Sequence, residues 1–213
     1  MRISIINGSP KLRESTSGLM IELLTPLISE NEIVVYRINQ GNLTERQFAD
    51  IKNSDVLIFA FPLYVDSIPA HLLHLLIELE ERNFFNPNTM VYCIVNNGFF
   101  EGNQNHVAVS QMKNWCKATG LTWGQAVGVG AGEMLPFLKD IPLGHGPNKN
   151  IGMACRELAC NIMAFSSGED LFISPNWPRF LWRIQASLSV WYPRAKKNGL
   201  KRKNLFEQIH KTE

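Results

Sequence analysis

The residues that follow the first apolar run of the chain have the side chains of an anion-binding loop. The run Arg2–Asn7 breaks into Gly8-Ser9-Pro10-Lys11, and Ser15-Thr16-Ser17 follows shortly after. Backbone N–H groups at a helix N-terminus point at a bound anion, the helix dipole favours negative charge, and hydroxyl groups add donors. We therefore predict a strand, a phosphate-binding loop and a helix that begins near Ser17. The alternative is an ordinary connecting loop with an N-capping Ser or Thr.

This loop lacks the two nucleotide-binding patterns that are most easily recognised in a sequence. No Gly-Lys-Ser/Thr closes the loop, which argues against a nucleoside-triphosphatase. Gly-x-Gly-x-x-Gly is also absent from it, which argues against the usual dinucleotide fingerprint. A glycine run does occur at residues 128–132, but a lone run of this kind is weak evidence, and a tight turn explains it.

Two later loops carry residues suited to a flat ring with a polar edge. Residues 61–70 are apolar and aromatic, with Pro62 and Pro69 near the two ends. Residues 96–105 combine amide side chains, glycines and the pair Phe99-Phe100. A heteroaromatic ring stacks on apolar surface while amide groups bond its polar edge. Together with the first loop, these segments predict a site for a ring that bears a phosphate.

The elements that would position these loops follow from hydrophobic periodicity. Five apolar strand candidates occur, at Arg2–Asn7, Glu32–Ile38, Asp55–Phe61, Thr89–Asn96 and Leu121–Val129. Apolar residues at three- and four-residue spacing indicate helices near Ser17–Ser29, Thr44–Asn53, Pro69–Arg82, Asn105–Thr119 and Asn150–Phe165. Strict alternation predicts an α/β fold with a doubly wound parallel sheet. Five strands fit the flavodoxin-like order 2-1-3-4-5, whose ligand crevice lies at the carboxyl ends of strands one and three.

These motifs resemble those of the flavodoxin-like NAD(P)H-dependent FMN reductase and quinone reductase superfamily. Asn7-Gly8-Ser9-Pro10-Lys11, followed by Ser15 and Ser17, is similar to the phosphate loop of that family. Pro62-Leu63-Tyr64, followed by Pro69-Ala70, is similar to its Pro-x-Tyr…Pro-Ala segment beside the flavin ring. The resemblance covers about residues 1–165. The clustered cysteines of the iron–sulfur flavoproteins in this superfamily are missing.

The resemblance implies a role for each loop. The first loop would contact the FMN phosphate, the second would flank the ring, and the third would approach the pyrimidine edge of the ring. The candidate cofactor-binding residues are Ser9, Pro10, Lys11, Ser15, Thr16, Ser17, Pro62, Leu63, Tyr64, Val65, Asn97, Gly98 and Phe99.

The function implied by the resemblance is that of an FMN-dependent oxidoreductase. It would pass electrons from NAD(P)H, as co-substrate, through bound flavin to a quinone, a flavin or another small acceptor. The flavin carries the chemistry, so no side chain is assigned as catalytic. The alternatives are a flavodoxin-like electron carrier or non-catalytic flavin-binding module that serves a protein partner, and a scaffold that has lost the flavin. A net charge of +2 counts against a carrier, since such carriers are generally strongly acidic.

Composition sets the broad class of the protein. The chain has 213 residues, of which 45% are hydrophobic and 19% charged, values typical of a globular domain. We expect no signal peptide and no membrane span, and hence a cytoplasmic protein. The cysteines show no C-x-x-C or other metal-ligand spacing, and we expect Cys93 and Cys116 to be buried thiols. His71, His74 and Glu78 could share a helix face, but nothing accompanies them that would complete a metal site.

The charge of the chain is divided unevenly. Residues 171–213 contain nine Lys/Arg and two Glu, a net +7, which leaves −5 for the remainder and gives the total of +2. We predict an FMN-binding domain over residues 1–165 and an aromatic, basic helical extension over residues 166–213. Such aromatic surface favours a homodimer, with an interfacial helix on anionic lipid as the alternative. We expect no nucleic-acid partner, since no nucleic-acid-binding module is recognisable.

Overall fold

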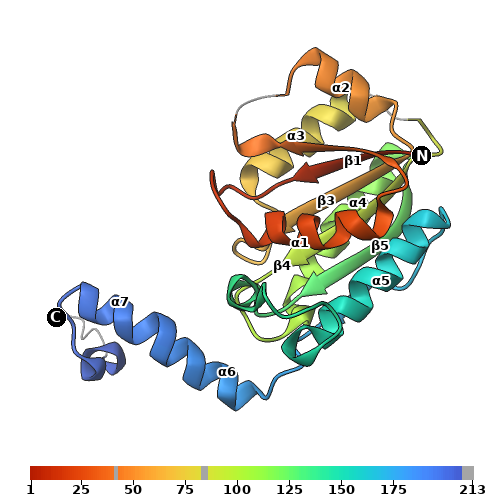
Figure 1. The fold of residues 1–213 in the computed structure, drawn as a ribbon. Helices are drawn as coiled ribbons and strands as arrows, with labels where there is room; N and C mark the ends of the chain where they lie inside the picture. Colours follow the sequence, from red (N-terminus) through yellow and green to blue (C-terminus); the bar gives the residue numbers. More distant parts are fainter. Residues whose placement is uncertain (41–42, 83–85, 208–213) are drawn as a thin grey trace, which may run out of the picture. The chain divides into compact units, whose positions relative to one another are not determined.

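A computed structural model describes residues 1–40, 43–82 and 86–207, and it contains a parallel β-sheet with helices on both faces (Figure 1). Within the described residues the sheet has six strands in the order β2-β1-β3-β4-β5-β6, and every neighbouring pair is parallel. The strands are β1 (Arg2–Asn7), β2 (Glu32–Arg37), β3 (Val56–Pro62), β4 (Met90–Asn96), β5 (Thr122–Val129) and β6 (Leu171–Ile173).

Two layers of helices enclose this sheet. The helices of the sheet domain are α1 (Thr16–Leu24), α2 (Glu45–Lys52), α3 (Ala70–Glu81), α4 (His106–Thr119) and α5 (Lys149–Met163). Apolar side chains of α1 and α5 pack against one face, and those of α2, α3 and α4 pack against the other (Figure 1). The central strands are covered on both faces, which explains why they are continuously apolar in sequence. In β3, for example, every residue from Val56 to Phe61 is buried.

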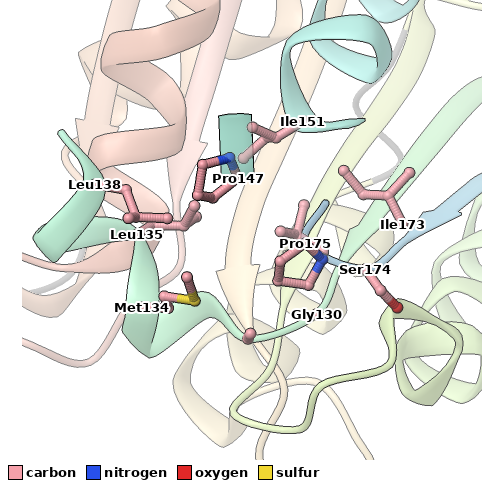
Figure 2. Close-up of a pocket in the computed structure, with 11 residues that line it drawn as sticks. Gly130, Met134, Leu135, Leu138, Pro147, Ile151, Ile173, Ser174 and Pro175 are labelled. Atoms are coloured by element: carbon pink, nitrogen blue, oxygen red, sulfur yellow. The ribbon is translucent and has the colours of Figure 1, made fainter. Parts of the chain in front are cut away.

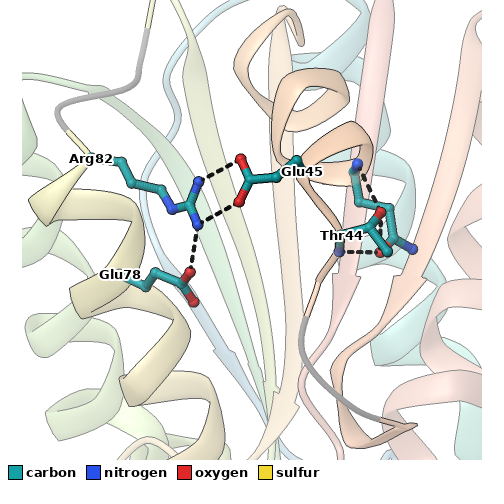
Figure 3. Close-up of polar contacts among 5 residues, drawn as sticks. Thr44, Glu45, Glu78 and Arg82 are labelled. Carbon is teal, nitrogen blue, oxygen red and sulfur yellow. Dashed lines mark hydrogen bonds and ion pairs between the residues drawn. The ribbon is translucent and has the colours of Figure 1, made fainter.

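The helix α2 is fixed at its N-terminus by two polar contacts. Thr44 and Gln47 form a capping box, in which the Gln47 N–H donates to Thr44 Oγ1 (3.3 Å) and the Thr44 N–H donates to Gln47 Oε1 (2.8 Å). The guanidinium of Arg82, just after α3, donates to both carboxylate oxygens of Glu45 (3.0 and 2.9 Å) and to Glu78 (2.9 Å), as Figure 3 shows. These bonds hold the pKa of Glu45 below its usual value.

The five strands predicted from the sequence are confirmed within one residue at each end, but the predicted strand count is wrong. A sixth strand, β6, pairs with β5 through Val127–Leu171, Gly128–Phe172 and Val129–Ile173. It has only three residues, which is too short for a periodicity to be recognised. Asp170, directly before β6, accepts hydrogen bonds from Trp123 Nε1 (3.1 Å) and the Ala126 N–H (2.9 Å) and thereby aligns β6 with β5.

The chain divides into two compact units, Met1–Asn176 and Trp177–Glu213. Because β6 belongs to the sheet, the division lies after Asn176 and not at residue 165, where the sequence analysis placed it. The described part of the second unit consists of α6 (Arg179–Ala186), a π-helical turn (Ser187–Trp191), α7 (Tyr192–Lys197) and a 3₁₀ turn (Arg202–Phe206). Among the helices that the structure describes, none is both long and apolar enough to span a membrane.

Candidate functional site

The loops that follow β1, β3 and β4 meet at one cavity of about 120 Å³. Residues far apart in the sequence share this cavity because the carboxyl ends of parallel strands lie at the same edge of a sheet. The 3₁₀ helix Gly132–Leu138, which follows β5, also contributes a residue to the lining of this cavity. The lining residues are Ser9, Lys11, Ser15, Thr16, Ser17, Pro62, Leu63, Tyr64, Asn96, Asn97, Gly98 and Glu133.

The N-terminus of α1 forms the polar end of this cavity. Ser15 is the N-cap residue, and its Oγ accepts a hydrogen bond from the Gly18 N–H (3.0 Å). The first N–H groups of α1 have no carbonyl of a preceding turn to bond, so those of Thr16 and Ser17 suit an anion. Ser17 is buried, and its Oγ accepts a hydrogen bond from Asn96 Nδ2 (2.9 Å), which leaves its own O–H to donate. The side chains and N–H groups of the predicted anion-binding loop therefore meet at one point of the cavity.

Hydrogen bonds within the loop after β1 hold it in shape. The Ser9 N–H donates to Asn7 Oδ1 (3.0 Å), and the Lys11 N–H donates to Ser9 Oγ (3.3 Å). A Cβ atom at Gly8 would lie 2.7 Å from Leu72 Cδ2 and 3.0 Å from Phe61 Cβ, so a larger residue at this position would force the Leu72 side chain of α3 to move. Burial lowers the pKa of His71, which is also in α3, and a smaller effect of the neighbouring Gly8 backbone opposes this shift.

The loop after β3 contains a tight turn with an unusual backbone. The Tyr64 and Ser67 main chains exchange two hydrogen bonds of 3.1 and 3.0 Å. Between them, Val65 and Asp66 have φ angles of 48° and 56°, and a positive φ is rare for a β-branched residue. Gln111 of α4 holds this turn, because its Oε1 accepts hydrogen bonds from Ser67 Oγ (3.1 Å) and the Ile68 N–H (3.3 Å). The strained turn presents Tyr64, which is 45% exposed, at the cavity.

The loop after β4 contributes a buried oxygen atom without a partner. Asn97 donates through Nδ2 to the Glu101 carbonyl (3.2 Å), whereas its Oδ1 atom is buried and has no hydrogen-bond partner among the described residues. Its main chain is held on both sides, since its N–H donates to the Val129 carbonyl (3.0 Å) and its carbonyl accepts from the Gly132 N–H (2.7 Å). Buried acceptors are almost always paired in native proteins. Asn97 Oδ1 is therefore suited to accept a hydrogen bond from a ligand.

Most of the residues predicted for the site line the cavity, but three do not. Pro10, Val65 and Phe99 are exposed residues of the same loops and lie outside the cavity lining. Sequence reasoning missed Asn96 and Glu133, which do line it. Glu133 follows the glycine run after β5. The rule that places the ends of parallel strands at one edge could have indicated it.

A second, much smaller cavity lies beside β6 (Figure 2). Its volume of about 10 Å³ corresponds to about one water molecule, and apolar side chains such as Leu135, Leu138, Ile151 and Ile173 surround it. It is a packing gap between the end of β6, the segment that follows β5 and the first turn of α5. Within the described residues, no group of three or more His, Cys, Asp or Glu side chains is arranged to hold a metal ion.

The fold is shared with solved structures of low sequence identity. The NAD(P)H:quinone oxidoreductase of Methanothermobacter marburgensis matches 76% of this chain and 97% of its own at 17% identity, with a TM-score of 0.58. A flavodoxin of Streptococcus pneumoniae TIGR4 matches 77% of this chain and 99% of its own at 12% identity, with a TM-score of 0.57. An azoreductase of Bacillus anthracis str. Sterne matches 76% of this chain and 97% of its own at 15% identity, with a TM-score of 0.53.

These likenesses establish that the chain has a flavodoxin-like fold. No protein-family model matches the sequence, and no curated protein sequence matches it.

Proposed function

We propose that the protein is a flavin-dependent oxidoreductase that binds FMN at the cavity between the β1, β3 and β4 loops. The observation that carries this proposal is the combination of two features at one cavity: the N-terminus of α1 with its buried hydroxyl groups, and the unpaired Asn97 Oδ1. The first fits a phosphate. The second fits an N–H donor such as the one on the pyrimidine edge of a flavin.

The size of the cavity indicates how much of FMN it would hold. About 120 Å³ is well below the roughly 300–1,000 Å³ of pockets that enclose a drug-sized ligand. The phosphate and part of the ribityl chain fit this volume, and the ring would lie at its open side, where Tyr64 is half exposed. Partial exposure of the ring is consistent with a reaction in which a second substrate must approach it.

The charges at the cavity favour a single phosphate group. The lining contains one cationic side chain, Lys11, and one carboxylate, Glu133. Their charges offset each other, so the helix N-terminus and neutral hydroxyl groups would supply most of the attraction for the anion. A terminal monoester such as that of FMN fits this arrangement better than the pyrophosphate of FAD.

When bound, FMN would accept a hydride from NAD(P)H and deliver electrons to a small acceptor such as a quinone or a free flavin. The chain's own contribution would be binding and orientation. Lys11, Ser15 and Ser17 would hold the phosphate, and Asn97 Oδ1 would fix the polar edge of the ring. Gln111 would position the Tyr64 turn beside the ring. The solved structures with this fold support the proposal, because two of them are named as a quinone oxidoreductase and an azoreductase.

An electron carrier is the second candidate, because one of the similar solved structures is named a flavodoxin. The net charge of +2 argues against it, since carriers that dock on partner proteins are generally acidic. The two candidates differ in one measurable property. A reductase accepts hydride from a free nicotinamide nucleotide, whereas a carrier requires a protein donor.

Titration of the purified protein with FMN, followed by quenching of flavin fluorescence, tests the binding step. We expect saturation at micromolar FMN. Anaerobic addition of NADH and of NADPH to the loaded protein then tests the reaction, and we expect bleaching of the flavin absorbance with at least one of them, followed by its return on addition of a quinone.

Absence of FMN binding would reject the flavin site. Binding of FMN without reduction by either nucleotide would reject the reductase and favour the carrier.

A further inference from the structure

The second unit of the chain presents an apolar stripe on the surface of a helix. Phe180 and Ile184 lie four residues apart on one face of α6, and Leu188 follows four residues later, in the π-helical turn Ser187–Trp191. Their exposed fractions are 63%, 52% and 53%, and Trp191, at the end of the same π-helical turn, is 55% exposed. Exposed apolar residues that occur singly are normal, but a continuous stripe marks an interaction surface.

The remainder of this unit is basic and contains no acidic side chain before Glu207. Residues 177–206 include no Asp or Glu and carry eight basic residues, namely Arg179, Arg183, Arg194, Lys196, Lys197, Lys201, Arg202 and Lys203. The basic turn after α7 folds back on it. The Arg202 guanidinium lies 4.3 Å from the Tyr192 ring centroid, and the Leu200 N–H donates to the Ala195 carbonyl (2.8 Å). The positive charge is thus concentrated around the C-terminal end of the helix.

We propose that this helix binds the surface of an anionic lipid bilayer, with the Phe180–Ile184–Leu188 stripe in the acyl boundary and the basic residues at the headgroups. A helix with aromatic and aliphatic residues on one face and Lys/Arg elsewhere, and no acidic residue, has the composition of an interfacial helix. Anionic headgroups attract each Lys or Arg near the surface. The helix would lie in the plane of the membrane.

A second copy of the chain is the competing occupant of the stripe. Pairing of two such helices face to face would bring together two surfaces that each carry this positive charge, and their repulsion opposes the contact. An anionic bilayer, in contrast, attracts these basic residues. Charge complementarity therefore favours lipid over this face-to-face pairing, and attraction to the first unit of a second copy, whose residues 1–170 carry a net charge of −5, is the alternative that the test must distinguish.

The test compares two glutamate variants of the full-length protein, one with the substitution inside the apolar stripe and one with it on the neighbouring polar residue. Ile184→Glu places a carboxylate in the stripe, and Gln185→Glu places the same charge on the next residue, an exposed polar position off the stripe. Both are sedimented with vesicles of phosphatidylcholine alone and of phosphatidylcholine mixed with phosphatidylglycerol in equal amounts. Leu188→Glu and Ser189→Glu provide a second matched pair in case one variant folds poorly.

We expect the unaltered protein to sediment with the phosphatidylglycerol vesicles and not with phosphatidylcholine alone. Gln185→Glu should weaken this binding by about fivefold, because it adds one negative charge. Ile184→Glu should weaken it by about fiftyfold or more, because it adds the same charge and also removes an apolar anchor. Binding should also fall as ionic strength rises from about 0.1 M to about 1 M, where the Debye length shrinks from about 10 Å to about 3 Å.

Two results would overturn the proposal. Equal losses in Ile184→Glu and Gln185→Glu would show that the stripe does not enter the bilayer. Failure to bind either vesicle, together with a dimer in light scattering that Ile184→Glu converts to a monomer, would identify a second copy as the occupant.

Discussion

Ser17 connects two of the loops that form the cavity. Its Oγ accepts the Asn96 amide hydrogen, while Asn96 Nδ2 also donates to the Phe61 carbonyl (3.2 Å). The hydroxyl group is therefore held in place before any ligand arrives. This arrangement makes Ser17 a better probe of phosphate binding than Ser15, whose hydroxyl caps α1 and whose loss would cost about 1 kcal/mol of stability.

We expect Ser17→Ala to weaken FMN binding about tenfold or more, because a hydrogen bond to a charged group contributes roughly 1.5–3 kcal/mol. Riboflavin, which lacks the phosphate, should bind the variant and the unaltered protein with nearly equal affinity. Fluorescence quenching measures both ligands under the same conditions. Equal losses for FMN and riboflavin would show that the substitution disturbs the fold and does not remove a phosphate contact.

The residue types of the first loop predicted the polar end of the cavity, since Ser9, Lys11, Ser15, Thr16 and Ser17 all line it. Glu133 and the unpaired Asn97 Oδ1 could not be predicted in this way. Whether an asparagine oxygen finds a partner depends on contacts between loops that are distant in sequence. Pro10 and Val65 belong to the predicted loops, but a loop motif does not specify which of its side chains turn toward a ligand.

At the scale of elements, the loop after β4 is seated directly on β5 and β6. A Cβ atom at Gly102 would lie 2.2 Å from the Ile173 carbonyl oxygen and 2.6 Å from the Gly128 carbonyl oxygen. Both neighbours are main-chain atoms of paired strands, which cannot move without disturbing the sheet. A Cβ atom at Gly98, in the same loop, would meet no atom within 4 Å.

We therefore expect Gly102→Ala to destabilise the protein by about 2 kcal/mol or more, the range seen for overpacking of a well-packed core. Gly98→Ala should change the free energy of unfolding by less than about 0.5 kcal/mol. Urea unfolding followed by circular dichroism measures both variants. Equal midpoints for the two would contradict the close approach of this loop to β6.

The strands and helices of the first unit were predictable because each is long enough to show its periodicity. β6 was not predictable, because its three residues join the sheet through tertiary contacts that no sequence pattern indicates. The Asp170 carboxylate and the edge of β5 supply these contacts. Strand propensity has little influence when tertiary partners decide the pairing.

At the scale of the whole molecule, the two core layers hold thiols in their protonated form. Cys116, in α4, belongs to the core layer that also contains α2 and α3, and Cys155, in α5, belongs to the layer that also contains α1. Burial raises the pKa of each from 9.0 to about 12. In the unfolded chain both thiols ionise near their ordinary pKa. The folded state therefore holds protons that the unfolded state has lost between about pH 9 and pH 12.

The contribution of these two thiols to the free energy of unfolding is therefore fully present below about pH 8.5. It is lost as pH rises toward 12, because the unfolded state then binds fewer protons than the folded state. We expect a slope of about 1 kcal/mol per pH unit for each thiol in urea unfolding between about pH 9 and pH 11. Cys155→Ala should make this slope shallower. The same slope in Cys155→Ala and the unaltered protein would show that Cys155 does not contribute.

The position of β6 affects how the chain folds during its own synthesis. Domains form as the chain leaves the ribosome from its N-terminus, and the strand that closes the sheet beside β5 emerges only after α5. Until then β5 is an edge strand with unpaired N–H and C=O groups, which can pair with strands of other chains. The segment around Gly102, which rests on Ile173, also lacks its support during this interval. A nascent chain that stalls before residue 171 would therefore carry both an unpaired edge at β5 and an unsupported segment around Gly102.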